Sequence, residues 1–141
     1  MSGTLSSIAF IINDCSALFD RCYISSSVTR RNDFTTGVGT FWTCEQIGIV
    51  ERGDYLVTLN VFTVAPGTDN YIDITIFNKN TDPLASDVRV IRGQDVYRGS
   101  ISFLFFNYDL TNNVRGAIYS GSVPLTGTMI LSAILLRRYP S

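Results

Sequence analysis

Apolar and polar residues alternate along much of the chain, which is the pattern of strands that bury one face. The clearest example is residues 55–62, where every second residue is apolar and is predicted to face a core. Residues 72–76 alternate in the same way, and Asp73 and Thr75 are predicted to point outward. The predicted core set of the first strand is Tyr55, Val57, Leu59 and Val61.

Two later segments, residues 101–106 and 128–136, are apolar on both faces, which is more than a sandwich strand needs. The second apolar face has to be covered, and because no long helical pattern occurs, we expect another subunit to cover it. On the later segment we assign the odd positions to this outer face. The predicted subunit interface comprises Met129, Leu131, Ala133, Leu135, Phe106, Tyr108 and Tyr119.

Glycine and proline interrupt the chain at near-regular intervals, and the pieces between them are short and rich in β-branched and aromatic residues. This pattern predicts one all-β domain over residues 1–141, a two-sheet antiparallel jelly-roll sandwich. The pattern of residues 1–40 predicts structure less clearly. In that part, residues 6–10 fit a strand, residues 14–21 fit a helical turn or a loop, and residues 25–33 are predicted to be polar and exposed.

Charged residues make up only 16% of the 141 residues, against roughly a quarter in typical globular domains. This deficit predicts surface that is hidden in the working form, and oligomerisation is the simplest way to hide it. The net charge of −1 gives no positive field that would attract nucleic acid. No signal sequence and no apolar stretch of about 18 residues is found, so we expect a soluble protein without a membrane span.

The chain contains no histidine, which removes the common catalytic triads and the usual zinc ligands. It has no phosphate-binding loop, and its three cysteines lack metal-site spacing and are expected to be buried free thiols. The sequence therefore predicts a protein that is not an enzyme and needs no cofactor. Asp69 and Asp73 are candidate calcium ligands, but calcium takes about six to eight oxygens, so ordinary turn roles explain them better.

Two kinds of residue suggest contacts with other molecules. The pairs Arg30-Arg31 and Arg137-Arg138 are expected to form ion pairs between subunits, with Asp87, Asp95 or Asp109 as partners. Tyr23, Tyr71 and Tyr97 lie near predicted turns, where they either pack in the core or contact a receptor or a glycan.

Four short motifs resemble the globular head of C1q and, more distantly, tumour necrosis factor. They are Gly39-Thr40-Phe41-Trp42-Thr43-Cys44, Gly53-Asp54-Tyr55, the strand and Asn-bearing turn at 72–80, and Ser132-Ala133-Ile134-Leu135-Leu136. The likeness lies in order and spacing, and Val57 stands where this family has phenylalanine. The resemblance implies a ten-strand jelly roll that forms a trimer, with the inner sheets packed around a threefold axis.

Similar heads also occur in virus particles, so we expect a homotrimeric structural protein of a virus or phage particle, located in the virion. Its role would be that of a decoration, spike or minor capsid component that contacts other virion proteins. A receptor-binding head that recognises a cell-surface glycan or protein is the first alternative, and a secreted C1q-like module is the second. The preference for a virion role over these alternatives rests on fold analogy alone.

Overall fold

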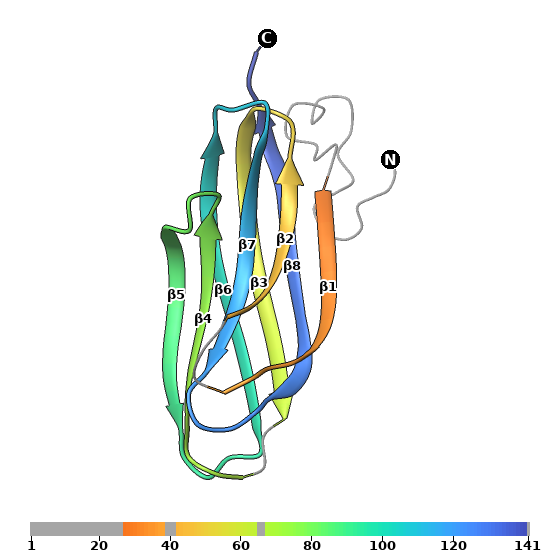
Figure 1. Cartoon of the computed structure of the whole chain (residues 1–141). Helices are drawn as coiled ribbons and strands as arrows, with labels where there is room; N and C mark the ends of the chain where they lie inside the picture. Colours follow the sequence, from red (N-terminus) through yellow and green to blue (C-terminus); the bar gives the residue numbers. More distant parts are fainter. Residues whose placement is uncertain (1–26, 39–41, 65–66, 141) are drawn as a thin grey trace.

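The computed structural model describes residues 27–38, 42–64 and 67–140, and this part of the chain contains eight strands and no helix (Figure 1). The predicted segments 55–62, 72–76, 101–106 and 128–136 all lie within strands. The expectations for residues 6–10 and 14–21, and for Cys15, Cys22 and Tyr23, fall outside the described residues. The strands are β1 (Ser27–Thr35), β2 (Thr43–Ile49), β3 (Gly53–Val64), β4 (Asn70–Asn78), β5 (Pro83–Ile91), β6 (Val96–Asn107), β7 (Asn112–Ser120) and β8 (Thr126–Arg138).

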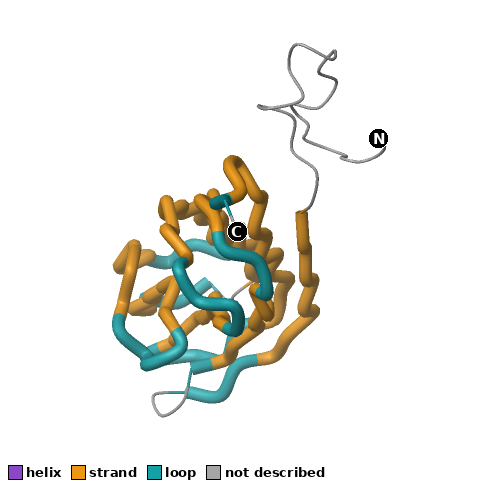
Figure 2. The backbone as a smooth tube through the Cα atoms, turned by 90° about the horizontal axis from the view of Figure 1, so that it is seen from above, coloured by secondary structure: helices purple, strands orange, loops and turns teal. Residues whose placement is uncertain are grey.

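The strands form two four-stranded antiparallel sheets with the orders β1-β8-β3-β6 and β2-β7-β4-β5. The pairs β1 with β8, β2 with β7, β3 with β6 and β4 with β5 are nested, as in one long hairpin folded over itself. Seen along the strands, the two sheets lie around a common interior and loops cross the ends (Figure 2). The all-β, two-sheet prediction is confirmed, and the strand order is consistent with a jelly roll.

The core lies between the sheets, and β3 and β4 contribute alternate residues to it. The predicted inward set on β3 is confirmed, since its side chains are 0–6% exposed. Ile72, Ile74 and Ile76 face it from β4 and are fully buried. Burial of each such side chain stabilises the fold by roughly 1.5–3 kcal/mol relative to leaving it in water. The period-two pattern of these two strands therefore predicted the centre of the core correctly.

Two edge strands were not predicted. Residues 25–33 were expected to be polar and exposed, and Thr29, Arg30, Arg31 and Asp33 are exposed as predicted. The strand was missed, because residues 27–33 form most of β1, which pairs with β8. Strand β5 pairs with β4 although Val88 and Val90 on it are about half exposed. Edge strands have a neighbour on one side only, so many of their side chains stay in water and their apolar pattern is weak. Thr75 points outward from β4 as predicted, yet it is only 3% exposed because paired strands flank it on both sides.

Two buried asparagines connect the loops at opposite ends of the sandwich. The Asn107 side-chain amide donates to the carbonyls of Glu51 and Asp109, each at 2.8 Å. Asn70 donates to the hydroxyl of Ser120 at 2.9 Å and accepts from the backbone N–H of Ser122 at 2.8 Å. Such buried amides satisfy loop groups that no sheet ladder reaches, and they hold the strand ends in register.

Tyr97 is 6% exposed, so the suggested receptor or glycan contact is wrong and it is a core residue. Burial and the nearby Asp87 carboxylate raise its pKa to about 12. Below pH 10 both states keep the phenolic proton, but between pH 10 and 12 only the unfolded state loses it. We therefore expect unfolding free energy to fall by roughly 2–3 kcal/mol across this window.

Urea unfolding of wild type and Tyr97→Phe at pH 9 to 12 measures this loss. The variant should lose less stability over the window, and a smaller slope should remain because the pKa of Tyr55 is also raised. Identical losses in the two proteins would contradict the assignment to Tyr97.

Candidate assembly face

The odd-numbered apolar residues of β8, which were predicted to form the subunit interface, face the core instead. Met129, Leu131, Ala133 and Leu135 are 0–3% exposed and belong to the core of the single chain. The register explains their position, because they pair with the four inward residues of β3. Assigning the odd positions of β8 to the outer face was therefore wrong. The side chains that face away from the core are the even ones, which include Ile130 and Ile134.

The outer face of the two central strands of this sheet carries no charged side chain from Leu56 to Val64 on β3 and from Thr126 to Ile134 on β8. A sheet face that meets water normally carries charged and strongly polar residues. We name this surface the assembly face. It comprises Leu56, Thr58, Asn60, Phe62 and Val64 on β3, Thr126, Thr128, Ile130, Ser132 and Ile134 on β8, and Leu104 and Phe106 on β6.

One end of the assembly face is apolar. Ile134, Leu56 and Leu104 are direct cross-strand neighbours, so their side chains form one row across β8, β3 and β6. Leu104 is 50% exposed, and Phe106 beyond it is 54% exposed. An exposed row of large apolar side chains on one flat face is a typical protein-contact surface.

Beside this apolar end, Tyr108 stacks on Tyr139 with a ring-centroid distance of 5.3 Å. The hydroxyl of Tyr139 donates to Asp54, and this bond is the main reason why the pKa of Tyr139 is raised. Two of the predicted interface residues, Phe106 and Tyr108, therefore lie at the same end of this sheet. Their place in an interface stays a prediction.

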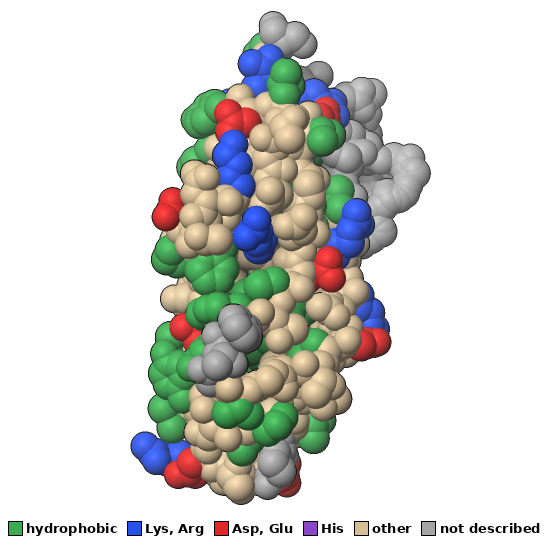
Figure 3. All heavy atoms as spheres, viewed as in Figure 1, with side chains coloured by type: hydrophobic (Ala, Val, Ile, Leu, Met, Phe, Trp, Pro, Cys, Tyr) green, Lys and Arg blue, Asp and Glu red, His purple; other side chains and the backbone are tan. Residues whose placement is uncertain are grey.

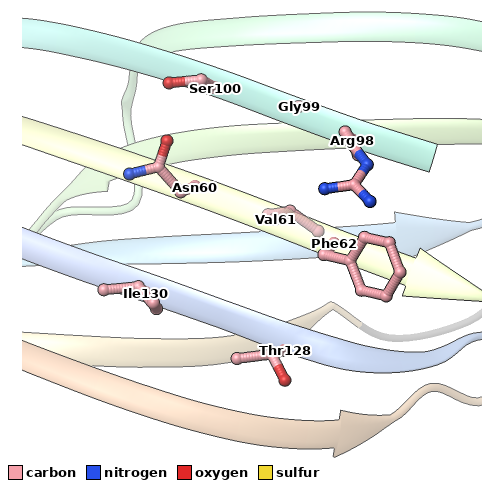
Figure 4. A pocket seen from close by; sticks show the side chains of 8 residues that line it. All are labelled: Asn60, Val61, Phe62, Arg98, Gly99, Ser100, Thr128 and Ile130. Carbon is pink, nitrogen blue, oxygen red and sulfur yellow. The ribbon is translucent and has the colours of Figure 1, made fainter.

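The other half of the assembly face holds a hollow of about 360 Å³ (Figure 4). Two cross-strand rows form it, Ser100-Asn60-Ile130 and Arg98-Phe62-Thr128. The guanidinium of Arg98 lies over the ring of Phe62, 4.6 Å from its centroid. The lining residues are Asn60, Val61, Phe62, Arg98, Gly99, Ser100, Thr128 and Ile130.

The groups in this hollow suit binding by shape and hydrogen bonds. Arg98 forms no ion pair within the described part of the chain. Thr128 donates its hydroxyl to Asp33 at 2.7 Å, and Arg31 donates to the same oxygen at 3.2 Å. These two hydrogen bonds lower the pKa of Asp33. The lining offers an amide, hydroxyls and a guanidinium beside apolar walls, and it contains no carboxylate or thiol that would act as a nucleophile or general base.

The remaining predicted site residues are not brought together. Tyr119 lies on the outer face of β7, in the opposite sheet. The Asp69 carboxylate is 3.4 Å from Arg92, whereas that of Asp73 accepts from Thr75. The two aspartates are four positions apart in the sequence, which corresponds to about 13 Å along an extended chain. Within the described ranges no three potential metal ligands of the His, Cys, Asp and Glu types come together, so the geometry gives the calcium candidates no support.

The basic pairs and Cys44 also differ from expectation. Arg31, Arg137 and Arg138 bind carboxylates of their own chain, with the partners Asp33, Asp54 and Glu51 at 3.2, 3.1 and 2.5 Å. The suggested partners Asp87 and Asp109 pair with Arg89 and Lys79 of the same chain. Cys44 is a free thiol as predicted, but it is exposed rather than buried.

Comparisons with models of known protein families and with curated protein sequences give no match. In the described residues, no helix has the length and apolar character to cross a membrane. Sequence reasoning missed the Arg98 hollow because three strands that are distant in the chain form it. The sequence did contain a signal for the exposed position of Leu104. Side chains alternate along residues 101–106, so Leu104 lies on the same face as Phe106, which was predicted to be at the interface.

Proposed function

We propose that this protein is a non-enzymatic structural protein that assembles into a homotrimer through its assembly face. The observation that carries the proposal is the uncharged outward face of β3 from Leu56 to Val64 and of β8 from Thr126 to Ile134, next to half-exposed Leu104 and Phe106. Covering these side chains removes apolar area from water at about 25 cal/mol per Å². Between these bounds no charged group on the two central strands would have to be desolvated at the same time. Asp54, which lies beyond them and opposite Phe106, already pairs with Arg137 of the same chain.

The trimeric state rests on the resemblance to C1q and tumour-necrosis-factor heads, in which inner sheets pack around a threefold axis. The β1-β8-β3-β6 sheet supplies a face suited to that position. In such an assembly, each apolar end contributes Leu56, Leu104 and Phe106 to a shared centre. The Arg98 hollow then lies at the same contact, where its guanidinium is available to a carboxylate or a carbonyl of the next subunit.

The setting that we propose is a virus or phage particle, with the trimer acting as a decoration, spike or minor capsid component. Its support is the strand order, because eight-stranded double-sheet jelly rolls recur in capsid proteins. This is an argument from fold analogy. Genomic context tests it directly: neighbouring capsid, portal or tail genes support the proposal, and a neighbourhood of metabolic or secretory genes contradicts it.

The assembly state is tested on the purified full chain. Size-exclusion chromatography with light scattering is expected to give a mass near three times 15.6 kDa at micromolar concentration. The mass should change little with moderate salt, because the apolar end of the assembly face, and not the Arg98 contact, is the main part of the proposed interface. A monomer at this concentration, or a stable dimer, would overturn the trimer.

A further inference from the structure

A second surface, on the opposite sheet, gathers aromatic side chains that the assembly proposal does not use. Trp42 contacts Phe77 with ring centroids 5.3 Å apart and Tyr119 at 5.5 Å. Tyr119 in turn contacts Tyr71 at 6.0 Å in an edge-to-face arrangement. We call these four residues the aromatic patch. It lies on the outer face of the β2-β7-β4-β5 sheet, where Figure 3 shows hydrophobic side chains gathered over β4 and β5.

The patch is open to solvent. Trp42 is 36% exposed and Tyr71 is 42% exposed. Gly121, which directly follows β7, lies beside Tyr71, and its backbone N–H donates to the Tyr71 carbonyl at 2.8 Å. A β-carbon at Gly121 would lie 3.1 Å from that of Tyr71, so the absence of a side chain leaves this flank of the tyrosine uncovered.

A carboxylate lies among these rings. Asp73 is the cross-strand neighbour of Tyr119, and Tyr71 and Thr75 lie two residues away from it on the same face. The hydroxyl of Thr75 donates to one carboxylate oxygen of Asp73 at 2.7 Å. None of the ion pairs in the described ranges involves Asp73. The patch therefore presents ring surfaces together with a hydrogen-bond acceptor that has no cationic partner.

We propose that the aromatic patch binds a neutral saccharide, with Trp42, Tyr71 and Tyr119 contacting the sugar rings and Asp73 accepting hydrogen bonds from their hydroxyls. The C–H groups on one face of a pyranose carry partial positive charge and are attracted to the electron-rich face of an aromatic ring. The hydroxyls around the rim of the sugar are donors that suit a carboxylate without a cationic partner. A sugar thus matches both features of this surface at once.

Other occupants match it less well. An apolar protein surface would bury the Asp73 carboxylate without a cation, which costs several kcal/mol. Nucleic acid and acidic sugars bring negative charge next to the Asp73 carboxylate, on a chain of net charge −1. Arg115 lies on the same face opposite Phe77, four positions along the strands from Asp73. The site also lies on the sheet opposite the assembly face, so assembly as proposed leaves it accessible. This inference does not depend on the trimer.

The test uses the full chain and three neutral probes, chitotriose, cellotriose and maltotriose. Trp42 is the single tryptophan of the chain, so fluorescence under tryptophan-selective excitation reports on the patch. We expect at least one trisaccharide to change this fluorescence with a Kd of roughly 1 mM or tighter. Sialyllactose serves as the acidic comparison and should bind more weakly.

Tyr71→Ala and Asp73→Ala are each expected to weaken binding by about tenfold or more, with unchanged far-UV circular dichroism. Val96→Ala, on the opposite sheet and 45% exposed, is the matched control and should bind like wild type. If no trisaccharide binds, or if Tyr71→Ala and Asp73→Ala bind like wild type, the proposal is wrong. If instead these two variants lower the assembled mass in light scattering, the patch is a subunit contact and the saccharide assignment is overturned.

Discussion

Leu131→Asp is expected to abolish folding of the chain. Leu131 is fully buried at the centre of β8 and pairs with the equally buried Leu59. The substitution removes the burial of one leucine and places a carboxylate between the sheets without a partner. The combined cost is on the order of 5 kcal/mol or more, which approaches the whole stability of a small domain. Far-UV circular dichroism should lose the sheet signal, and thermal scans should show no cooperative transition.

The matched control is the same substitution at a position outside the core. Leu104→Asp introduces the same carboxylate on β6, where the side chain is 50% exposed, and it should keep the sheet signal and a cooperative transition. A folded Leu131→Asp protein that merely loses its assembly would return Leu131 to the interface where its sequence pattern first placed it.

Leu104→Asp is in turn expected to dissociate the trimer while leaving the fold intact. Leu104 stands in the apolar row with Leu56 and Ile134, and each subunit would bring one new carboxylate to the shared contact. Because charges in a buried contact are costly without partners, we expect the dissociation constant to rise by about a hundredfold or more. Light scattering should then give a mass near 15.6 kDa at the concentration where wild type is assembled.

Val88→Asp is the control for this second experiment, since Val88 is 47% exposed on the outer face of the opposite sheet. It should leave the assembled mass unchanged. If Leu104→Asp assembles like wild type, the apolar end of the assembly face is not a subunit contact. If both variants dissociate, the loss follows from added charge in general and does not locate the interface.

The two proposed surfaces divide the sandwich between its sheets. Both combine apolar side chains with few charges, but they differ in shape and in hydrogen-bonding groups. The assembly face has hydroxyl and amide side chains with Arg98 at its edge, and the aromatic patch surrounds one carboxylate, Asp73. This difference is why one is assigned to another copy of the chain and the other to a hydroxyl-rich ligand.

Strands with one polar and one apolar face could be oriented from the sequence. On β4 the isoleucines alternate with Asp73 and Thr75, so only one face can enter a core, and Ile74 is fully buried as predicted. Leu59 on β3 was placed correctly because the odd residues around it are all apolar, whereas Thr58 and Asn60 beside it are polar. The class of fold also followed from the sequence, because short β-branched segments between turn residues leave few alternatives to a two-sheet sandwich.

Only the tertiary structure decided which face of β8 is inside. Both sets on this strand contain large apolar residues, although Thr128 and Ser132 make the even set the more polar one, and the pairing of Leu131 with Leu59 places the odd set inside. Edge strands β1 and β5 were identified only by their pairing with β8 and β4. Their side chains are largely in water, so their sequences show no clear apolar pattern. The Arg98 hollow and the aromatic patch likewise join strands that are far apart in the chain. Their positions depend on strand order and register, which local alternation does not determine.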